Sequence, residues 1–217
     1  MSIVIFSYSF LLLIVSVIGV IRYKKFTIPF KILAWSVIAI CLLSILSRIF
    51  SIKYRNNAPI LQIQCITEYI FYSLIYFYLF KNKTVKKLVI ISIIIMAVSF
   101  FINALFLQPF LTVFPTNIYL PAQILFAIFS LLLFKEMLLY PLKINITRQS
   151  VFWYNTAMLF YATTMFFNLG LSNYLAEHNL YDLIITYFWY LIIYLFHILI
   201  CIALLTENKK ITLSDAS

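Results

Sequence analysis

Glu68 is the residue of this sequence best placed to do chemistry, because it lies inside a long apolar run that holds no other charged residue. If this run is helical, Gln64 and Tyr72 lie on the same face, one turn to either side. An ionisable group at membrane depth costs about 2.5–3.5 kcal/mol on insertion scales, so it normally faces a bundle interior and has a polar partner. The spacing favours two roles for Glu68: the polar anchor of a ligand, or a hydrogen-bonded group that fixes helix register.

Four more polar side chains lie in other apolar runs, at comparable or shallower depth. They are Arg48, Asn103, Gln123 and Asn168. The Arg48 side chain starts near the end of its run and is long enough to reach inward. Together with Glu68 and its neighbours, these residues predict a ligand-binding pocket in the outer half of a helix bundle.

His197 is the second candidate for chemistry. Tyr190 and Tyr194 precede it by seven and three residues, so a helix places all three side chains in one stripe. Because an imidazole gains and loses a proton near neutral pH, such a stripe predicts a proton relay. The alternative is a histidine that simply makes an interhelical hydrogen bond.

The sequence lacks the residues that several catalytic chemistries require. A retinal Schiff base needs a lysine in the last span, and residues 183–205 contain none; intramembrane aspartyl proteolysis needs paired aspartates, and the apolar runs contain no Asp. The motifs HExxH, GxSxG and Walker A are absent, and two histidines are too few for a zinc site. We therefore expect a protein that is not an enzyme, with no catalytic residue, no metal and no cofactor.

Long apolar helices must position these residues. The chain is 65% apolar and 10% charged, whereas soluble domains are roughly 45–50% apolar and about 25% charged. About 20 helical residues cross the hydrocarbon core of a bilayer. We predict an all-α polytopic membrane protein that forms one seven-helix transmembrane domain, residues 1–217. The predicted spans are residues 3–21, 30–50, 60–80, 88–107, 118–140, 151–171 and 183–205.

The basic residues predict the orientation. Most of the 16 Lys and Arg residues lie in or beside the first, third and fifth loops and the C-terminal tail, whereas Arg48, Lys53 and Arg55 lie on the other side. Because cytoplasmic loops carry the excess of Lys and Arg, the N-terminus is expected outside and the C-terminus inside. We interpret the net charge of +10 as a topology signal and expect no nucleic-acid partner. The expected location is the inner (cytoplasmic) membrane of a bacterium.

Two short patterns resemble known membrane proteins. Thr67-Glu68-Tyr69 followed by further aromatics, and an aromatic last run containing Phe196-His197, are similar to small uncharacterised seven-helix bacterial inner-membrane proteins of sensory or accessory type. This resemblance implies a role in signalling. A second comparison is with seven-helix sugar and vitamin carriers, which have a Pro-Gln dipeptide; Pro121-Ala122-Gln123 is the nearest approach here.

Two functions remain open at this point. Carriers that alternate access usually have helices broken by Gly or Pro near the midplane, whereas Gly19 and Gly170 lie near span ends and the prolines lie in loops or first turns. The leading prediction is a non-enzymatic sensory or accessory module whose partners are the bilayer, a small or lipidic ligand, and another membrane or signalling protein. The alternative is a small-solute carrier that uses Glu68 or His197 for proton coupling.

Overall fold

The computed structural model describes residues 2–141, 145–177 and 183–208, and these form an all-α structure with seven α-helices. A π-helical turn, Asn103–Leu107, continues the fourth helix, and short 3₁₀ turns flank two others. Each predicted span coincides with one helix to within a few residues. The helices are α1 (Ser2–Arg22), α2 (Ile28–Tyr54), α3 (Ala58–Leu79), α4 (Lys83–Ile102), α5 (Thr116–Leu139), α6 (Ser150–Glu177) and α7 (Leu183–Thr206).

Six of these helices are long and apolar enough to cross a membrane, and α6 is not among the six. Helix α6 spans 28 residues, so its length is sufficient; its composition is what differs from the other helices. Its polar side chains include Asn155, Thr163, Thr164 and Asn168, and both asparagines are buried. The predicted span at 151–171 is therefore one helix of the bundle, and its polar residues lower its mean hydropathy.

Helix ends follow local sequence signals. Pro29 and Pro59 lie in the first turns of α2 and α3, where a missing N–H costs no hydrogen bond. The Asn82 side chain caps α4 by accepting a hydrogen bond from the backbone N–H of Thr84. Pro121 departs from the prediction, because α5 begins at Thr116 and the proline lies inside the helix.

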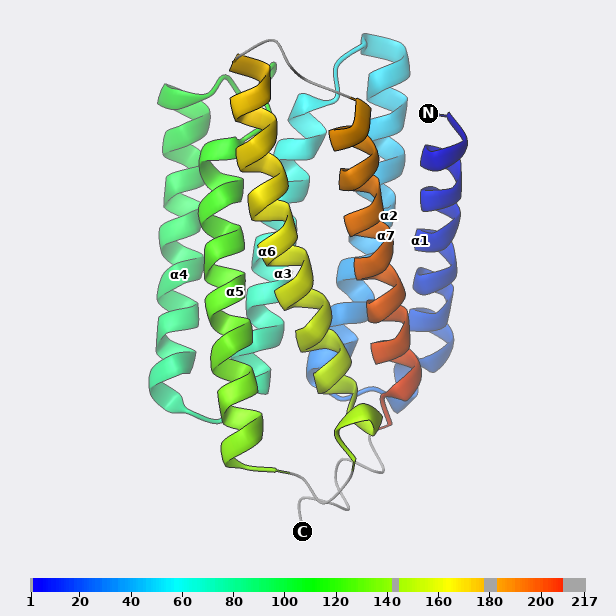
Figure 1. Cartoon of the computed structure of the whole chain (residues 1–217), viewed down its shortest axis with the longest axis vertical. Helices are drawn as coiled ribbons and strands as arrows, with labels where there is room; N and C mark the ends of the chain where they lie inside the picture. Colours follow the sequence, from blue (N-terminus) through cyan, green and yellow to red (C-terminus); the bar gives the residue numbers. More distant parts are fainter. Residues whose placement is uncertain (1, 142–144, 178–182, 209–217) are drawn as a thin grey trace.

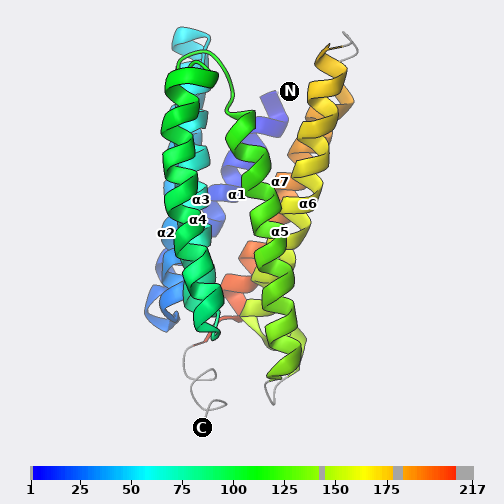
Figure 2. The same ribbon diagram turned by 90° about the vertical axis from the view of Figure 1, so that its left-hand side faces the viewer.

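Six helices form a closed ring in the order α1, α2, α3, α5, α6, α7. Contacts between α1 and α7 and between α3 and α5 close this ring, while α4 lies outside it and packs on α3 and α5. The side view shows the helices running roughly along one common axis (Figure 2). Helix α1 begins at the end of the bundle opposite to the one where α7 ends (Figure 1).

The outer surface of the ring and of α4 is apolar. Large side chains such as Ile94, Val98 and Phe101 on α4 are more than half exposed. In water such a surface would be unstable, whereas in a bilayer it contacts acyl chains. With six apolar helices of spanning length, the chain is an integral, multi-pass membrane protein.

The half of the bundle in which α7 ends has a tightly packed interior. Phe30 and Tyr154 are among its fully buried side chains. The Tyr76 hydroxyl lies 2.6 Å from the Ser130 Oγ and donates to the Asn155 Oδ1 at 3.1 Å. These bonds join α3, α5 and α6 where no water is needed to satisfy the polar groups.

At the same end, the buried carboxylate of Glu207 joins three segments. Its Oε1 accepts hydrogen bonds from the backbone N–H and the hydroxyl of Thr27, at 3.2 and 2.7 Å. Its Oε2 accepts from the hydroxyl of Ser150, the first residue of α6. Arg22 donates to the backbone oxygen of Glu207 at 3.1 Å. The link between α1 and α2, the start of α6 and the end of α7 are thus held by one side chain that the sequence reasoning missed.

Candidate ligand-binding cavity

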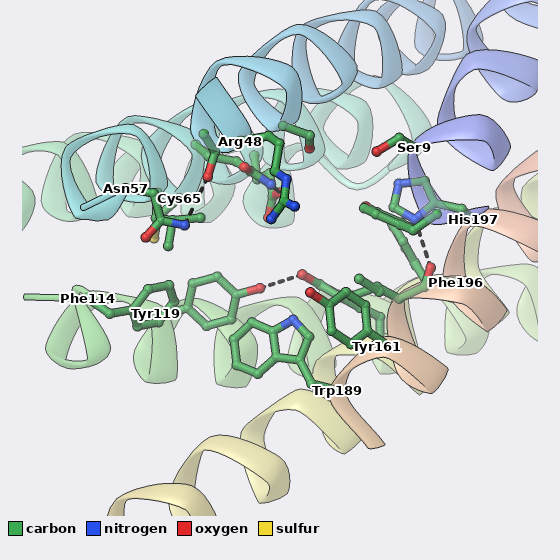
Figure 3. A pocket seen from close by; sticks show the side chains of 18 of the residues that line it. Ser9, Arg48, Asn57, Cys65, Phe114, Tyr119, Tyr161, Trp189, Phe196 and His197 are labelled. Atoms are coloured by element: carbon green, nitrogen blue, oxygen red, sulfur yellow. Dashed lines mark hydrogen bonds between the residues drawn. The ribbon is translucent and has the colours of Figure 1, made fainter. Parts of the chain in front are cut away.

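A cavity of about 440 Å³ lies inside the six-helix ring, in the half of the bundle where α1 begins. All six ring helices contribute to its lining, and α4 does not. Figure 3 shows the cavity between two walls of different character. One wall is polar and is built from α2 and α3, and the other is aromatic and is built mainly from α5, α6 and α7.

The polar wall results from helical spacing. On α2 the lining residues recur at intervals of three and four, and so do those on α3, so each set forms one face of its helix. The Asn57 side chain at the start of α3 donates to the Ser47 hydroxyl at 3.1 Å and ties the two helices together. The main polar lining residues are Ser44, Ser47, Arg48, Ser51, Gln64 and Glu68.

The aromatic wall is a set of rings in mutual contact. The hydroxyls of Tyr119 and Tyr161 are hydrogen-bonded to each other. The Trp189 ring stacks on Tyr119 with centroids 6.5 Å apart, and the Tyr161 ring lies 4.4 Å from that of Phe196. Because each ring is held by its neighbours, this wall is a rigid apolar surface with few hydroxyls.

Glu68, Gln64 and Tyr72 come together as the helical spacing predicts. The Glu68 side chain is 8% exposed, and its Oε1 accepts a hydrogen bond from Gln64 Nε2 at 2.7 Å. Tyr72 lines the cavity one turn further along α3 and is nearly fully buried. One carboxylate oxygen of Glu68 is therefore engaged by Gln64.

Arg48 lies on the same polar wall, and its guanidinium points into the space facing Tyr119 and Trp189 (Figure 3). Arg48 is exposed, whereas Glu68 is buried. Among the described residues, neither Arg48 nor Glu68 forms an ion pair. The cavity thus contains one cationic and one acidic side chain that do not neutralise each other.

His197 also lines the cavity and is 4% exposed. Its Nδ1 lies 2.8 Å from the backbone oxygen of Ile193, whereas its buried Nε2 has no hydrogen-bond partner. The backbone oxygen can only accept, so Nδ1 carries the proton and the Nε2 of the neutral ring is a free acceptor. Tyr190 lines the cavity, but Tyr194 does not; the Tyr194 hydroxyl is hydrogen-bonded to Ser7. Of the predicted relay stripe, Tyr190 and His197 therefore line the cavity, whereas Tyr194 contacts α1.

Three predicted pocket residues lie elsewhere. Asn103 is on the α4 side, outside the ring, where its side chain bonds Gln108 and Asn117. Asn168 faces α7 and donates weakly to the backbone oxygen of Ile185 at 3.5 Å. Gln123 is buried on α5, one turn beyond Tyr119, and is not a lining residue. Their positions along the apolar runs correctly predicted that these residues are buried. The rotation of each helix and the order of helices in the ring turn them away from the cavity.

Gln62 was not predicted as a site residue, although it shapes the cavity. Its buried amide nitrogen approaches the backbone oxygens of Phe110 and Val113 at 3.3 and 2.9 Å. These contacts hold the loop between α4 and α5, which carries the lining residue Phe114. The stripe of serines on α2 was also missed, although its spacing is visible in the sequence.

The cavity has the chemistry of a binding site. It combines hydroxyls, two amides, one carboxyl, one guanidinium and an imidazole with an aromatic surface. Within the described part of the chain, no three His, Cys, Asp or Glu side chains meet in a way that could hold a metal ion. No protein-family model, curated protein or solved structure matches this chain.

Proposed function

We propose that this membrane protein is a non-enzymatic sensory or accessory module that binds a small or lipidic ligand in the cavity, with Glu68 as the polar anchor. The observation that carries the proposal is the buried Glu68 carboxyl in the wall of a cavity of about 440 Å³. Ligand sites are typically clefts of about 300–1,000 Å³ with apolar walls and a few polar groups that fix orientation. A carboxyl at this depth costs free energy, so it normally faces a partner or a ligand in the bundle interior.

We further propose that all seven helices cross the bilayer and that the cavity faces the outside of the cell. Helix α6 runs beside α5 and α7 over the full height of the bundle (Figures 1 and 2). The end of the bundle opposite the cavity carries Arg22, Lys81 and Arg148 beside its loops. By the positive-inside rule this end lies in the cytoplasm, so a ligand would enter from the outer side.

The proposed sensor passes its signal to a partner protein. The described connections at the proposed cytoplasmic end are short, such as Tyr23–Thr27 and Phe80–Asn82, and leave no room for an effector domain between the helices. On this proposal, a ligand-induced change passes to another membrane or signalling protein through helix faces or loops.

A small-solute carrier is the second candidate. Glu68 and His197 line the same cavity, and two such groups could couple proton movement to solute binding. The packed half around Tyr76 and Tyr154 would have to open for a solute to leave on the other side. A carrier and a sensor thus differ in whether this packed half ever opens.

Ligand binding is tested by thermal unfolding of the detergent-purified protein with metabolite and lipid pools, in parallel on Glu68→Gln. A ligand that binds only the folded state raises its apparent stability, by about 2.7 kcal/mol at a hundredfold excess over Kd. We expect a hit with the wild type that the variant loses, while Gln123→Leu, which removes a buried polar group outside the cavity, keeps it. A ligand that stabilises all three proteins equally would contradict the role of Glu68.

Flux then separates the two candidates. The stabilising solute is radiolabelled and offered to proteoliposomes containing the wild type. Saturable binding without net uptake supports the sensor, whereas uptake that Glu68→Gln abolishes supports the carrier.

A further inference from the structure

We propose that the ligand of this cavity is a small zwitterion, whose ammonium group contacts Glu68 and whose anionic group contacts Arg48. This inference rests on the proposed function and adds the chemical class of the ligand. It starts from one acidic and one basic side chain that line the same cavity without forming an ion pair with each other or with any other described residue.

The two charged residues lie at different depths. Arg48 precedes the end of α2, Tyr54, by six residues, and Glu68 follows the start of α3, Ala58, by ten. At 1.5 Å per residue their backbones lie about 9 and about 15 Å from that end of the bundle. The Glu68 backbone is therefore about 6 Å deeper in the bundle than the Arg48 backbone. A molecule with one charge of each sign fits this order with its ammonium group leading.

The deeper part of the cavity has what an ammonium group needs. An ammonium has three N–H donors and no acceptor. Glu68 accepts a hydrogen bond from Gln64 and also interacts with the Tyr161 hydroxyl, but the two oxygens of a carboxylate have about four lone-pair sites and can accept further bonds. The buried Nε2 of His197 is an acceptor without a partner. The rings of Tyr161 and Phe196 also line the cavity, and aromatic rings near a cation attract it.

The outer part suits an anion and an apolar substituent. Arg48 presents a planar fork of N–H donors that matches a carboxylate or a phosphate, and the Ser47 and Ser51 hydroxyls lie within one turn of it on α2. Trp189 and Tyr119 face Arg48 across the cavity (Figure 3). A free amino acid with an apolar side chain and the phosphoethanolamine head of a lipid share this chemistry.

A ligand with a single charge would leave one side chain uncompensated. A simple amine would bind Glu68 but make no favourable contact with Arg48. A simple carboxylate would bind Arg48 but be repelled by Glu68. The carboxylate of such a ligand would be repelled most strongly at Glu68, which is buried, whereas Arg48 is exposed. The arrangement therefore selects for a zwitterion against both single-charge analogues.

The test measures binding by calorimetry with matched probes. Phenylalanine, phenethylamine and 3-phenylpropionate share a ring and differ in charge; the other proteinogenic amino acids cover different side chains. O-phosphoethanolamine represents a lipid headgroup. We expect at least one zwitterion to bind about tenfold or more tightly than its single-charge analogues, since a charge-assisted hydrogen bond is worth about a factor of ten or more. Preference for amino acids or for O-phosphoethanolamine identifies the source.

Two variants test the assignment of the charges. Arg48→Gln should reduce the preference for the zwitterion over its amine analogue about tenfold, and Glu68→Gln should do the same relative to the carboxylate analogue. Lys53→Gln is the matched control, because Lys53 lies on the same helix, is exposed and interacts with the Tyr54 ring. It should leave both preferences unchanged. Thermal unfolding without ligand verifies that each variant is folded.

The inference is overturned if no zwitterion binds, or if a neutral or singly charged probe binds as tightly as the best zwitterion. If a neutral metabolite stabilises the wild type but not Glu68→Gln, the cavity still binds a ligand and only the zwitterion assignment is lost. If nothing in the pools or the probe set binds, the proposed function fails as well.

Discussion

Truncation of Glu207 should destabilise the protein strongly, although the residue lies far from the cavity. In Glu207→Ala the backbone N–H of Thr27 and two hydroxyls lose their acceptor at a site that is 1% exposed. Each hydrogen bond to a charged group is worth about 1.5–3 kcal/mol. The sum of three is an upper limit, because burial of the carboxylate itself is costly and the hydroxyls can turn to other acceptors.

We therefore expect Glu207→Ala to lower the free energy of unfolding by about 3 kcal/mol. Glu207→Gln keeps one oxygen for Thr27 but loses the second acceptor and the charge, so we expect a loss of about 1–2 kcal/mol. The assay is unfolding by titration of SDS into mild detergent micelles, followed by circular dichroism. Glu136→Ala is the control, because Glu136 accepts one hydrogen bond, from the Lys81 backbone, and is only partly buried.

A double-mutant cycle with Ser150→Ala isolates the bond between α6 and α7. We expect a coupling free energy of about 1 kcal/mol or more, as for residues in one hydrogen-bond network. The reasoning is refuted if Glu207→Ala costs no more than Glu136→Ala, or if the cycle shows no coupling. In that case the three segments are held by apolar packing and the carboxylate is incidental.

Two further predictions concern helix packing and the loop above the cavity. A Cβ on Gly19 would lie 3.2 Å from the Cβ of Ala34, whereas one on Gly170 meets nothing within 4 Å. Gly19→Leu should therefore destabilise the α1–α2 contact by about 1–3 kcal/mol, and Gly170→Ala should stabilise α6 by about 0.5–1 kcal/mol; SDS titration measures both. Gln62→Leu removes the amide that holds the loop 108–115. We expect faster hydrogen exchange in that loop than in the wild type; unchanged exchange would show that the loop is held by its own contacts.

The helices could be predicted closely from the sequence, for a physical reason. Apolar runs of spanning length are helical in a bilayer because every backbone polar group must be satisfied within its own segment. The spacing of four residues likewise brought Gln64 to Glu68, since an i, i+4 pair depends only on helix geometry. Helix α6 is the exception in composition, because its inward face carries buried polar side chains such as Asn155 and Asn168 while its outer face, with Phe167, is apolar.

The order of helices around the ring could not be predicted. Asn103 was expected in the pocket because of its depth, but α4 packs outside the ring and its residues cannot reach the interior. Gln123 and Asn168 are buried as expected but are turned away from the cavity. Glu207 lies at the end of an apolar run and resembles a solvated terminal residue in the sequence; only the approach of Thr27 and Ser150 makes it a buried junction.

The sequence by itself determined that the chain is helical and inserted in a membrane. It also determined how far along its helix each polar side chain lies. These properties depend on residue type and on a rise of about 1.5 Å per residue. The tertiary structure decided which faces meet. It brought Arg48, Glu68 and His197 from three helices into one cavity, because the neighbours of a helix depend on how all the side chains of the bundle pack together.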